Sequence, residues 1–264
     1  MITYRKTQSG ETERLISLWL RCFDEKEEAA RLFFERNLPH LHGYAAVEDE
    51  MIIAAVYLID CTLCGKPAHY LCGAATLPEH RRRGIMSTLI AYALDDAEKR
   101  GDCYSVLTPA DEGLYRFYAR LGYTGGCSVC RGEFSAISGE NRGGEPDLRQ
   151  LQNCNKDKFL LWNNNFIKFA EEYYGCYGVK ALKNRRVFAL YESDDDNAEV
   201  FYAIYDSIKE LKASLYSEGI RRFTLAGSAL DPDFEGCEPQ RCGMIKPLNG
   251  SESLNDVYIG LTLQ

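Results

Sequence analysis

Residues 76–90 read TLPEHRRRGIMSTLI, and the interpretation of the whole chain starts from this stretch. It follows an apolar run and opens a helix, at whose start stand three consecutive arginines: Arg81, Arg82 and Arg83. The first N–H groups of a helix have no intrahelical partner and carry a partial positive charge, so they attract anions. Gly84 follows the arginines and has no Cβ, which lets backbone approach a phosphate closely. The stretch therefore predicts an anion-binding loop, to which the arginines add charge-assisted donors.

The spacing of apolar residues predicts the elements around this loop. Ahead of it we expect a strand (2–5), two amphipathic helices (one from near Leu15, one over 25–35) and an antiparallel meander of three strands (44–47, 51–63 and 68–76). After it, a helix over residues 85–100 is ended by Gly101. The strand that follows, 103–108, should lie parallel to the third strand, because a helical crossover joins the two. A short helix over 114–120 comes next.

Two motifs in this order resemble those of the GNAT acyltransferases. The spacing Arg81-x-x-Gly84, between a strand and a helix, resembles the loop with which that family binds the pyrophosphate of acetyl-CoA. The segment LYRFYARLGY, residues 114–123, resembles the second GNAT signature, an aromatic pair followed by a basic residue and Gly-Tyr or Gly-Phe. Neither a G-x-x-x-x-G-K-[ST] nor a G-x-G-x-x-G motif is present in the loop. The string HRRRGIM, with Met86 where many members have Gly or Ala, is closer to the branch of Eis-type aminoglycoside and lysine acetyltransferases.

The resemblance covers residues 1 to about 130 and implies an α/β (α+β) GNAT fold, a mixed, mostly antiparallel sheet flanked by helices. It implies that the pantetheine arm of CoA runs beside the third strand where that strand separates from the fourth. A backbone N–H group of the third strand is then expected to polarise the thioester carbonyl. The cofactor-binding residues that the resemblance implies are Ala75, Thr76, Leu77, Arg81, Arg82, Arg83, Gly84, Ile85, Met86 and Ser87.

Tyr118 matches the tyrosine that protonates the leaving thiolate across much of this family, and Tyr115 is the neighbour most easily confused with it. A tyrosine hydroxyl is a plausible proton donor to a developing thiolate. The alternative is a core aromatic at helical spacing from Leu114 and Leu121. The base that takes the proton of the amine stays open among His69, Asp60, Asp111, Glu112 and, as in Eis-type proteins, the C-terminal carboxylate, here on Gln264.

A linker rich in Gly, Ser and charge is predicted over 135–150, between a catalytic domain (1–134) and a second domain (151–264). The second domain is expected to contain a helix marked by Phe159, Trp162, Phe166, Ala170 and Tyr173, strands at 179–182, 186–192, 198–202, 222–226, 243–247 and 256–262, and a helix carrying Ile204, Ile208, Leu211 and Leu215 that ends at Gly219. This order repeats that of the first half, but no Arg-x-x-Gly loop precedes its helix. The resemblance to tandem Eis-like proteins implies a duplicated, degenerate GNAT-like domain without a CoA site. We expect no counterpart of the third, C-terminal domain of the longer Eis-type proteins.

Composition limits the classes of function. The 264 residues are 45% hydrophobic and 27% charged, which is ordinary for a globular protein. Apolar runs are too short to cross a bilayer and the N-terminus lacks the apolar centre of a signal peptide, so we expect a cytoplasmic protein that needs no membrane. A net charge of −8 argues against a nucleic-acid partner and is compatible with a cationic substrate. The oligomeric state does not follow from the sequence.

Eleven cysteines, without an export signal, are expected to be reduced thiols. Two C-x-x-C pairs, Cys61/Cys64 and Cys127/Cys130, are possible zinc half-sites, but they stand much farther apart than in a zinc ribbon or finger. We therefore predict no metal site.

The sequence predicts an N-acetyltransferase that moves an acetyl group directly from acetyl-CoA to a primary amine of a small molecule or peptide. One alternative is a catalytically inactive protein that binds CoA or another ligand. Another is a tandem-GNAT aminoacyl transferase, which would need a basic surface for tRNA.

Overall fold

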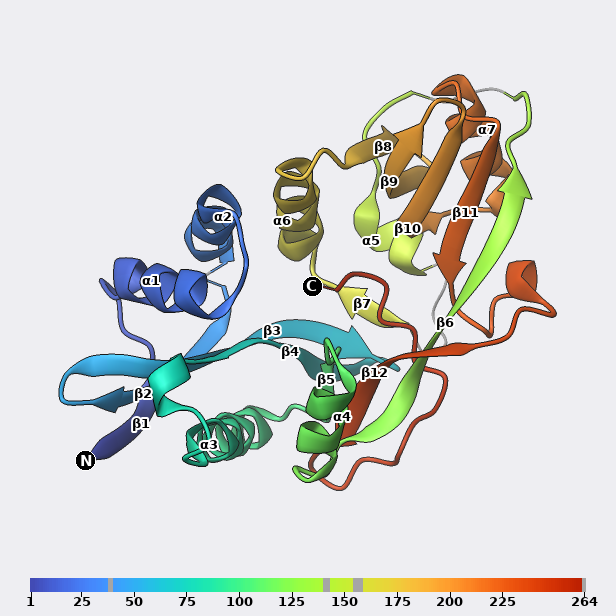
Figure 1. Ribbon diagram of the computed structural model, residues 1–264. Helices are drawn as coiled ribbons and strands as arrows, with labels where there is room; N and C mark the ends of the chain where they lie inside the picture. The colour runs from blue at the N-terminus through green and yellow to red at the C-terminus, as the bar shows by residue number, and fades with distance from the viewer. Residues whose placement is uncertain (38–39, 140–142, 154–158, 263–264) are drawn as a thin grey trace. The chain divides into compact units, whose positions relative to one another are not determined.

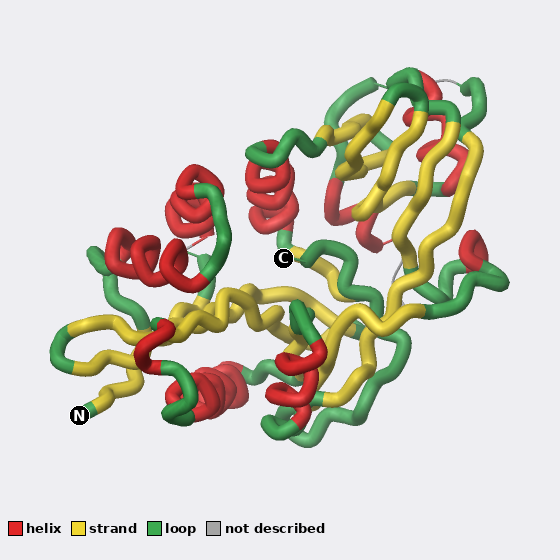
Figure 2. Tube along the Cα trace, viewed as in Figure 1, coloured by secondary structure: helices red, strands yellow, loops and turns green. Residues whose placement is uncertain are grey.

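The computed structural model of this chain describes residues 1–37, 40–139, 143–153 and 159–262. The chain forms two compact units, each a β-sheet flanked by helices (Figures 1 and 2). The first unit contains Met1–Thr124 and Met244–Ser253, and the second contains Gly125–Gly243 and Leu254–Gln264. The mixed, mostly antiparallel α/β architecture agrees with the fold class expected from the sequence.

The sheet of the first unit has the strand order β1-β2-β3-β4-β5-β12. Its strands are β1 (Ile2–Lys6), β2 (His42–Glu48), β3 (Met51–Leu63), β4 (Lys66–Thr76), β5 (Tyr104–Leu107) and β12 (Gln240–Pro247), of which residues 244–247 pair with β5. Neighbouring strands are antiparallel except β4 and β5, which are parallel and joined by a helix, as predicted.

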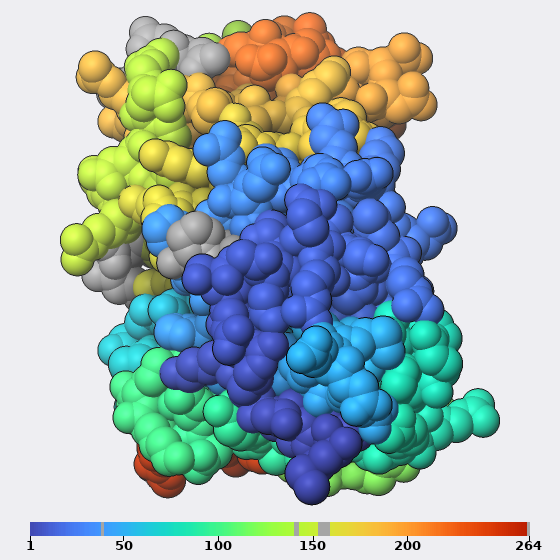
Figure 3. Space-filling model, turned by 90° about the vertical axis from the view of Figure 1, so that its left-hand side faces the viewer, coloured from blue at the N-terminus to red at the C-terminus, as the bar shows by residue number. Residues whose placement is uncertain are grey.

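Helices cover both faces of this sheet: α1 (Thr12–Cys22) and α2 (Glu27–Asn37) lie on one face and α3 (Ile85–Arg100) on the other (Figure 1). Trp19 on α1 stacks on Phe33 of α2, with ring centroids 4.8 Å apart, and both contact Tyr57 of β3. Gly73 of β4, at φ +59°, lies directly under this cluster, and a Cβ there would collide with the Trp19 ring. The outer sides of α1 and α2, in blue, form part of the surface in Figure 3.

Helix α3 has the bounds that its sequence predicts. Gly101 adopts the left-handed conformation (φ +98°) at its C-terminus, where Lys99 and Arg100 in the last turn complement the negative end of the helix dipole. The next helix, α4 (Glu112–Ala119), begins two residues before the predicted start because the Asp111 side chain accepts a hydrogen bond from the Leu114 N–H and caps it.

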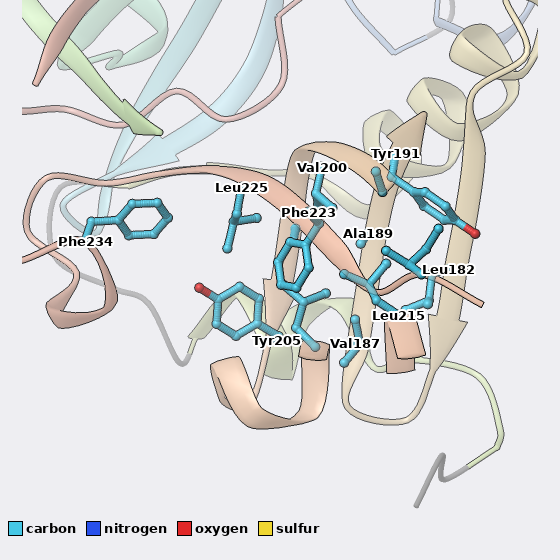
Figure 4. Close-up of a cluster of buried hydrophobic side chains, with 14 of the residues drawn as sticks. Leu182, Val187, Ala189, Tyr191, Val200, Tyr205, Leu215, Phe223, Leu225 and Phe234 are labelled. Atoms are coloured by element: carbon cyan, nitrogen blue, oxygen red, sulfur yellow. The ribbon is translucent and has the colours of Figure 1, made fainter. Parts of the chain in front are cut away.

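The second unit has the strand order β6-β11-β10-β9-β8. Its elements are β6 (Thr124–Ser135), α5 (Leu148–Asn153), β7 (Leu160–Trp162), α6 (Asn164–Gly175), β8 (Lys180–Asn184), β9 (Val187–Asp194), β10 (Asn197–Tyr205), α7 (Ile208–Ser217) and β11 (Arg222–Gly227). The series from α6 to β11 repeats the first unit: a helix, an antiparallel meander, a second helix and a strand parallel to the last strand of the meander. Its core includes Val200, Leu215 and Phe223 (Figure 4).

The division into units differs from the predicted domains, 1–134 and 151–264, at both ends. Strand β6 belongs to the second unit, because it pairs with β11 from Arg222↔Ser135 to Gly227↔Cys130. Residues 244–253 belong to the first unit, because β12 supplies the strand beside β5. Residues 140–142 of the expected linker lie outside the described part of the chain.

Three local predictions in the second half need correction. Phe159 and Trp162 precede α6, which starts only at Asn164, because the Asn163 side chain caps it by accepting a hydrogen bond from the Phe166 N–H. Ile204 lies in β10 rather than in the helix that follows, whose cap is Ser207. The predicted strand 256–262 is reduced to isolated bridges at Val257 and Tyr258.

None of the helices in the described residues combines the length and the apolar character needed to cross a membrane.

Candidate active site

The predicted anion-binding loop leads from β4 through a 3₁₀ turn, η1 (Pro78–His80), to the start of α3. Two of its residues, Arg82 (φ +62°) and Gly84 (φ +74°), are in the left-handed conformation. Among the described residues none accepts a hydrogen bond from the backbone N–H groups of residues 82–87, and the first helical bond is from Thr88 N–H to the Gly84 carbonyl, at 3.1 Å. The space that a Cβ of Gly84 would enter is open. Six consecutive N–H groups in the loop and the first turn of α3 thus have no internal acceptor, and the space at Gly84 is open, which suits a diphosphate.

The three arginines of the loop have different roles. Arg81 turns back and donates from Nε to the Thr76 carbonyl, at 3.0 Å. Arg83 makes a two-bond ion pair with Glu48 of β2, at 2.9 and 3.0 Å, and this pairing lowers the pKa of the Glu48 carboxyl. Arg82 alone of the three has no side-chain partner in the described part of the chain. Arg82 is therefore the arginine of the three whose guanidinium group is not engaged by another described residue.

Strands β4 and β5 separate where the resemblance places the pantetheine arm. They pair only over residues 68–70 and 104–106, so residues 71–76 of β4 have a strand neighbour, β3, on one side alone. Leu77 N–H donates to the Ile53 carbonyl of β3, at 3.0 Å, which makes Thr76↔Ala54 the non-hydrogen-bonded pair that precedes it.

Thr76 consequently directs its backbone groups away from β3 and into the gap between the separating strands. The Arg81 bond to its carbonyl agrees with this direction, and the N–H of a strand residue points to the same side as its C=O. By the same alternation, the backbone N–H and C=O groups of Ala75 and Leu77 point toward β3. Of the three nominated residues, Thr76 is therefore the one whose N–H can meet a ligand in the gap, and the Leu77 N–H is already used within the sheet.

Tyr118, on α4, is 6% exposed and packs against Phe117 and Tyr123, with ring centroids 5.1 and 5.7 Å away. No described residue forms a hydrogen bond with its hydroxyl. Burial raises the pKa of Tyr118 well above its usual value, and the neighbouring Cys72 thiol adds to the effect. Cys72 lies on the part of β4 that has left β5, so its electrostatic effect on Tyr118 indicates that this side chain is near the separated part of β4.

The structural partners of His69, Asp60 and Asp111 are defined. His69 is completely buried on β4, where its Nδ1 lies 2.6 Å from Asp102, and no described residue contacts its Nε2 by a hydrogen bond. Asp60 pairs with His42 on the neighbouring strand, at 3.1 Å, and Asp111 caps α4. Glu112 is exposed in the first turn of α4, and Gln264 lies outside the described residues.

The two C-x-x-C pairs do not assemble a metal centre in the part of the chain that is described. Within it, no three His, Cys, Asp or Glu side chains lie close enough together to hold a metal ion. Cys61 is buried and Cys64 is exposed at a turn, whereas Cys127 and Cys130 are both buried in the second unit.

Two residues of the site were not anticipated from the sequence. Glu48 forms an ion pair with Arg83, and Cys72 acts electrostatically on Tyr118. Both contacts join segments far apart in the chain, and neither residue belongs to a motif, so no spacing signal marks them.

Residues 3–125 match the family described as the Acetyltransferase (GNAT) domain. No curated protein matches the chain. The match to the GNAT domain family spans the loop, the separating strands and Tyr118.

Solved structures with the same fold extend over nearly the whole chain. A probable N-acyltransferase from Enterococcus faecalis is similar with a TM-score of 0.69 at 15% identity, over 94% of this chain and 73% of that one. Eis1 from Mycobacterium abscessus gives a TM-score of 0.66 at 16% identity, over 94% and 73%. A tandem GNAT protein from the clavulanic acid biosynthesis pathway gives 0.53 at 12% identity, over 96% and 100%. At these identities the likeness establishes the fold alone.

Proposed function

We propose that this protein moves an acetyl group from acetyl-CoA to a primary amine of a small molecule or peptide, since residues 3–125 match the acetyltransferase (GNAT) domain family. The observation that carries the proposal is the row of six N–H groups at residues 82–87 that lack internal acceptors. Hydrogen bonds to a charged group contribute ~1.5–3 kcal/mol each, so such a row can hold a diphosphate firmly. Arg82, the arginine without a partner in the described chain, adds positive charge at the same place.

Acetyl-CoA supplies an acetyl group activated as a thioester and a thiol as leaving group. Thr76 N–H, directed into the gap between β4 and β5, is suited to donate to the carbonyl oxygen, where negative charge grows during attack by the amine. Because this N–H belongs to a strand held by β3, it needs no rearrangement to act.

Tyr118 is suited to protonate the departing sulfur. Its raised pKa keeps the hydroxyl protonated over the whole physiological range. The same burial also raises the pKa of the Cys72 thiol, so a thiolate that forms in this environment is a stronger base than in water. Burial thus makes the Tyr118 phenol a weaker acid and the thiolate a stronger base, and these two changes partly offset each other. The proton can therefore pass from the phenol to the sulfur.

We propose that the second unit has lost the CoA site. Its helix α7 stands where α3 stands in the first unit, between two parallel strands, but its N-terminus is already occupied. The Ser207 side chain accepts from the Glu210 N–H, and the Glu210 carboxylate lies in the first turn, paired with Arg186 at 3.0 Å. A negative charge at that position repels a phosphate, whereas the first turn of α3 has no acidic residue.

The proposal is tested by thiol release from acetyl-CoA in the presence of aminoglycosides, polyamines, lysine-containing peptides and amino acids. We expect free thiol in equimolar amount with an acetylated amine, identified by mass spectrometry, for at least one class. Cationic amines are the first choice because the protein has a net charge of −8.

Binding of CoA without thiol release for any amine would instead indicate a binding protein. Retardation of tRNA on a gel at low salt, with no thiol release, would indicate an aminoacyl transferase.

A further inference from the structure

A concave pocket of about 370 Å³ lies within the second unit, built from the end of α6 and from β9 and β10. Its lining combines four aromatic rings with two carboxylates: Tyr173, Tyr174, Tyr177, Phe201, Glu192 and Glu199. The volume is in the range of small-ligand sites. The match to the acetyltransferase family ends before the first of these residues.

The aromatic wall is held in place by contacts within the unit. Tyr174 packs on Phe201, with ring centroids 5.0 Å apart, and its hydroxyl donates to the Thr262 carbonyl. Tyr173 lies between Tyr174 and Tyr177, at 5.5 and 5.7 Å. Phe201 is the extra residue of a β-bulge in β10, a feature that re-aims a side chain relative to the regular alternation of the strand.

The two carboxylates stand directly opposite each other. Glu192 of β9 and Glu199 of β10 are register partners, an arrangement in which like charges destabilise a sheet. Their neighbours Tyr191 and Val200 belong to the hydrophobic core of the unit (Figure 4), so by strand alternation both glutamates point to the opposite face, where the pocket lies.

The fold provides no counterion for this pair in the described chain. Neither the Glu192 nor the Glu199 carboxylate has an ion pair or a hydrogen bond with any residue described. The two lysines of the neighbouring strand β8 are used elsewhere, since Lys180 donates to Ser193 at 2.8 Å and Lys183 pairs with Glu171 at 2.7 Å.

We propose that this pocket binds a small alkylammonium ion. Aromatic faces attract a cation through their quadrupoles, most effectively one that is only weakly hydrated, such as an alkylated ammonium. The glutamate pair adds two negative charges at the rim, and a bound cation relieves their repulsion. Every residue that lines the site belongs to the second unit.

Choline is the probe, and 3,3-dimethylbutan-1-ol is its uncharged counterpart of the same shape. Titration of the full-length protein by calorimetry at low salt should show choline binding at least tenfold more tightly than the alcohol. Equal affinity for choline and the alcohol would show that the pocket binds by apolar contacts without recognising the charge, and would contradict the proposal. No heat from choline up to 20 mM would also overturn the proposal.

Variants locate the site. Glu192→Gln and Tyr177→Leu, both at exposed positions, should each weaken choline binding at least fivefold. Asp195→Asn removes the same charge from the turn of the same hairpin, outside the pocket, and should leave the affinity within twofold. If Asp195→Asn weakens binding as much as Glu192→Gln, choline responds to the general charge of the protein and the proposal fails.

Discussion

At the scale of the residue, the Tyr118 hydroxyl separates catalysis from packing. Tyr118→Phe keeps the ring among Phe117 and Tyr123 and removes the only proton that this side chain can give. If Tyr118 protonates the leaving thiolate, kcat should fall by ~10²–10⁴, while the affinity for CoA stays nearly constant, because the hydroxyl acts on charge that appears only in the transition state. Measuring kcat and Tm together checks this.

Tyr123→Phe is the matched control, since the Tyr123 hydroxyl bonds Ser105 at 2.5 Å in a buried contact. It should lower Tm and leave kcat within about threefold, and the same pattern for Tyr118→Phe would make Tyr118 a structural residue.

Gly84 tests the loop. A valine there would place Cβ in the open space in front of the N–H groups of residues 82–87, in a left-handed conformation that suits glycine. We expect Gly84→Val to raise the Kd for CoA at least tenfold, ~1.4 kcal/mol, in a calorimetric titration. Gly101→Val strains the other end of the same helix at φ +98° and should reduce stability without this loss of affinity. A Kd unchanged by Gly84→Val would place the phosphates elsewhere.

At the scale of the element, the buried His69 on β4 makes the first unit sensitive to acid. Burial lowers the pKa of His69, against the opposing effect of Asp102 and Asp60, with Arg100 adding to the lowering. The unfolded chain therefore takes up the proton first, near pH 6.5. The free energy of unfolding should fall as the pH drops below about 6.5 and continue to fall until the folded-state pKa is reached, with a slope of at most ~1.4 kcal/mol per pH unit from this group.

The variant His69→Gln removes the titrating ring, and Gln can still donate to Asp102. Denaturant unfolding between pH 6.5 and 5 should give a smaller slope for this variant than for the unchanged protein. The comparison uses slopes, so a uniform loss of stability does not disturb it. Equal slopes would show that His69 does not govern the acid response.

At the scale of the whole molecule, the first unit depends on a segment from the end of the chain. Residues 244–247 pair with β5, and Asn249 donates to the carbonyls of Glu98 and Asp102, at 3.0 and 2.9 Å. A chain cut after residue 134 would lack these contacts and expose β5 as an unpaired edge. We expect such a chain not to unfold cooperatively on heating.

Joining residues 244–253 back to residue 124 should restore the fold. Thr124 Oγ1 donates to the Ile245 carbonyl at 3.3 Å, so the two ends lie together and a short Gly-Ser linker can join them. Cooperative unfolding and CoA binding by this joined chain, but not by one with a scrambled 244–253 segment, would confirm the role of β12. Equal stability of the chain cut after residue 134 would contradict it.

The sequence by itself predicted the elements that are defined by neighbouring residues in the chain. The apolar spacing and Gly101 predicted α3 to the residue, and the loop from Arg81 to Gly84 was expected to offer unpaired N–H groups because every helix N-terminus does. Tyr118 was nominated through a local motif that starts in the short helix α4, and its role stays a prediction. The spacing of Phe159 and Trp162 wrongly predicted that they belong to the helix. The reason is also local, since the Asn163 cap makes α6 begin after them.

Only the tertiary structure decided which distant segments meet. Strand pairing is set by the summed contacts of whole sheets. The sequence of residues 240–247 therefore does not indicate that this strand pairs with β5 rather than with its neighbours in sequence. The partner of Arg83 and the direction of the Thr76 N–H depend on strand register in the same way. Register is fixed by side chains packing across strands far apart in the chain, and a local sequence pattern does not contain that information.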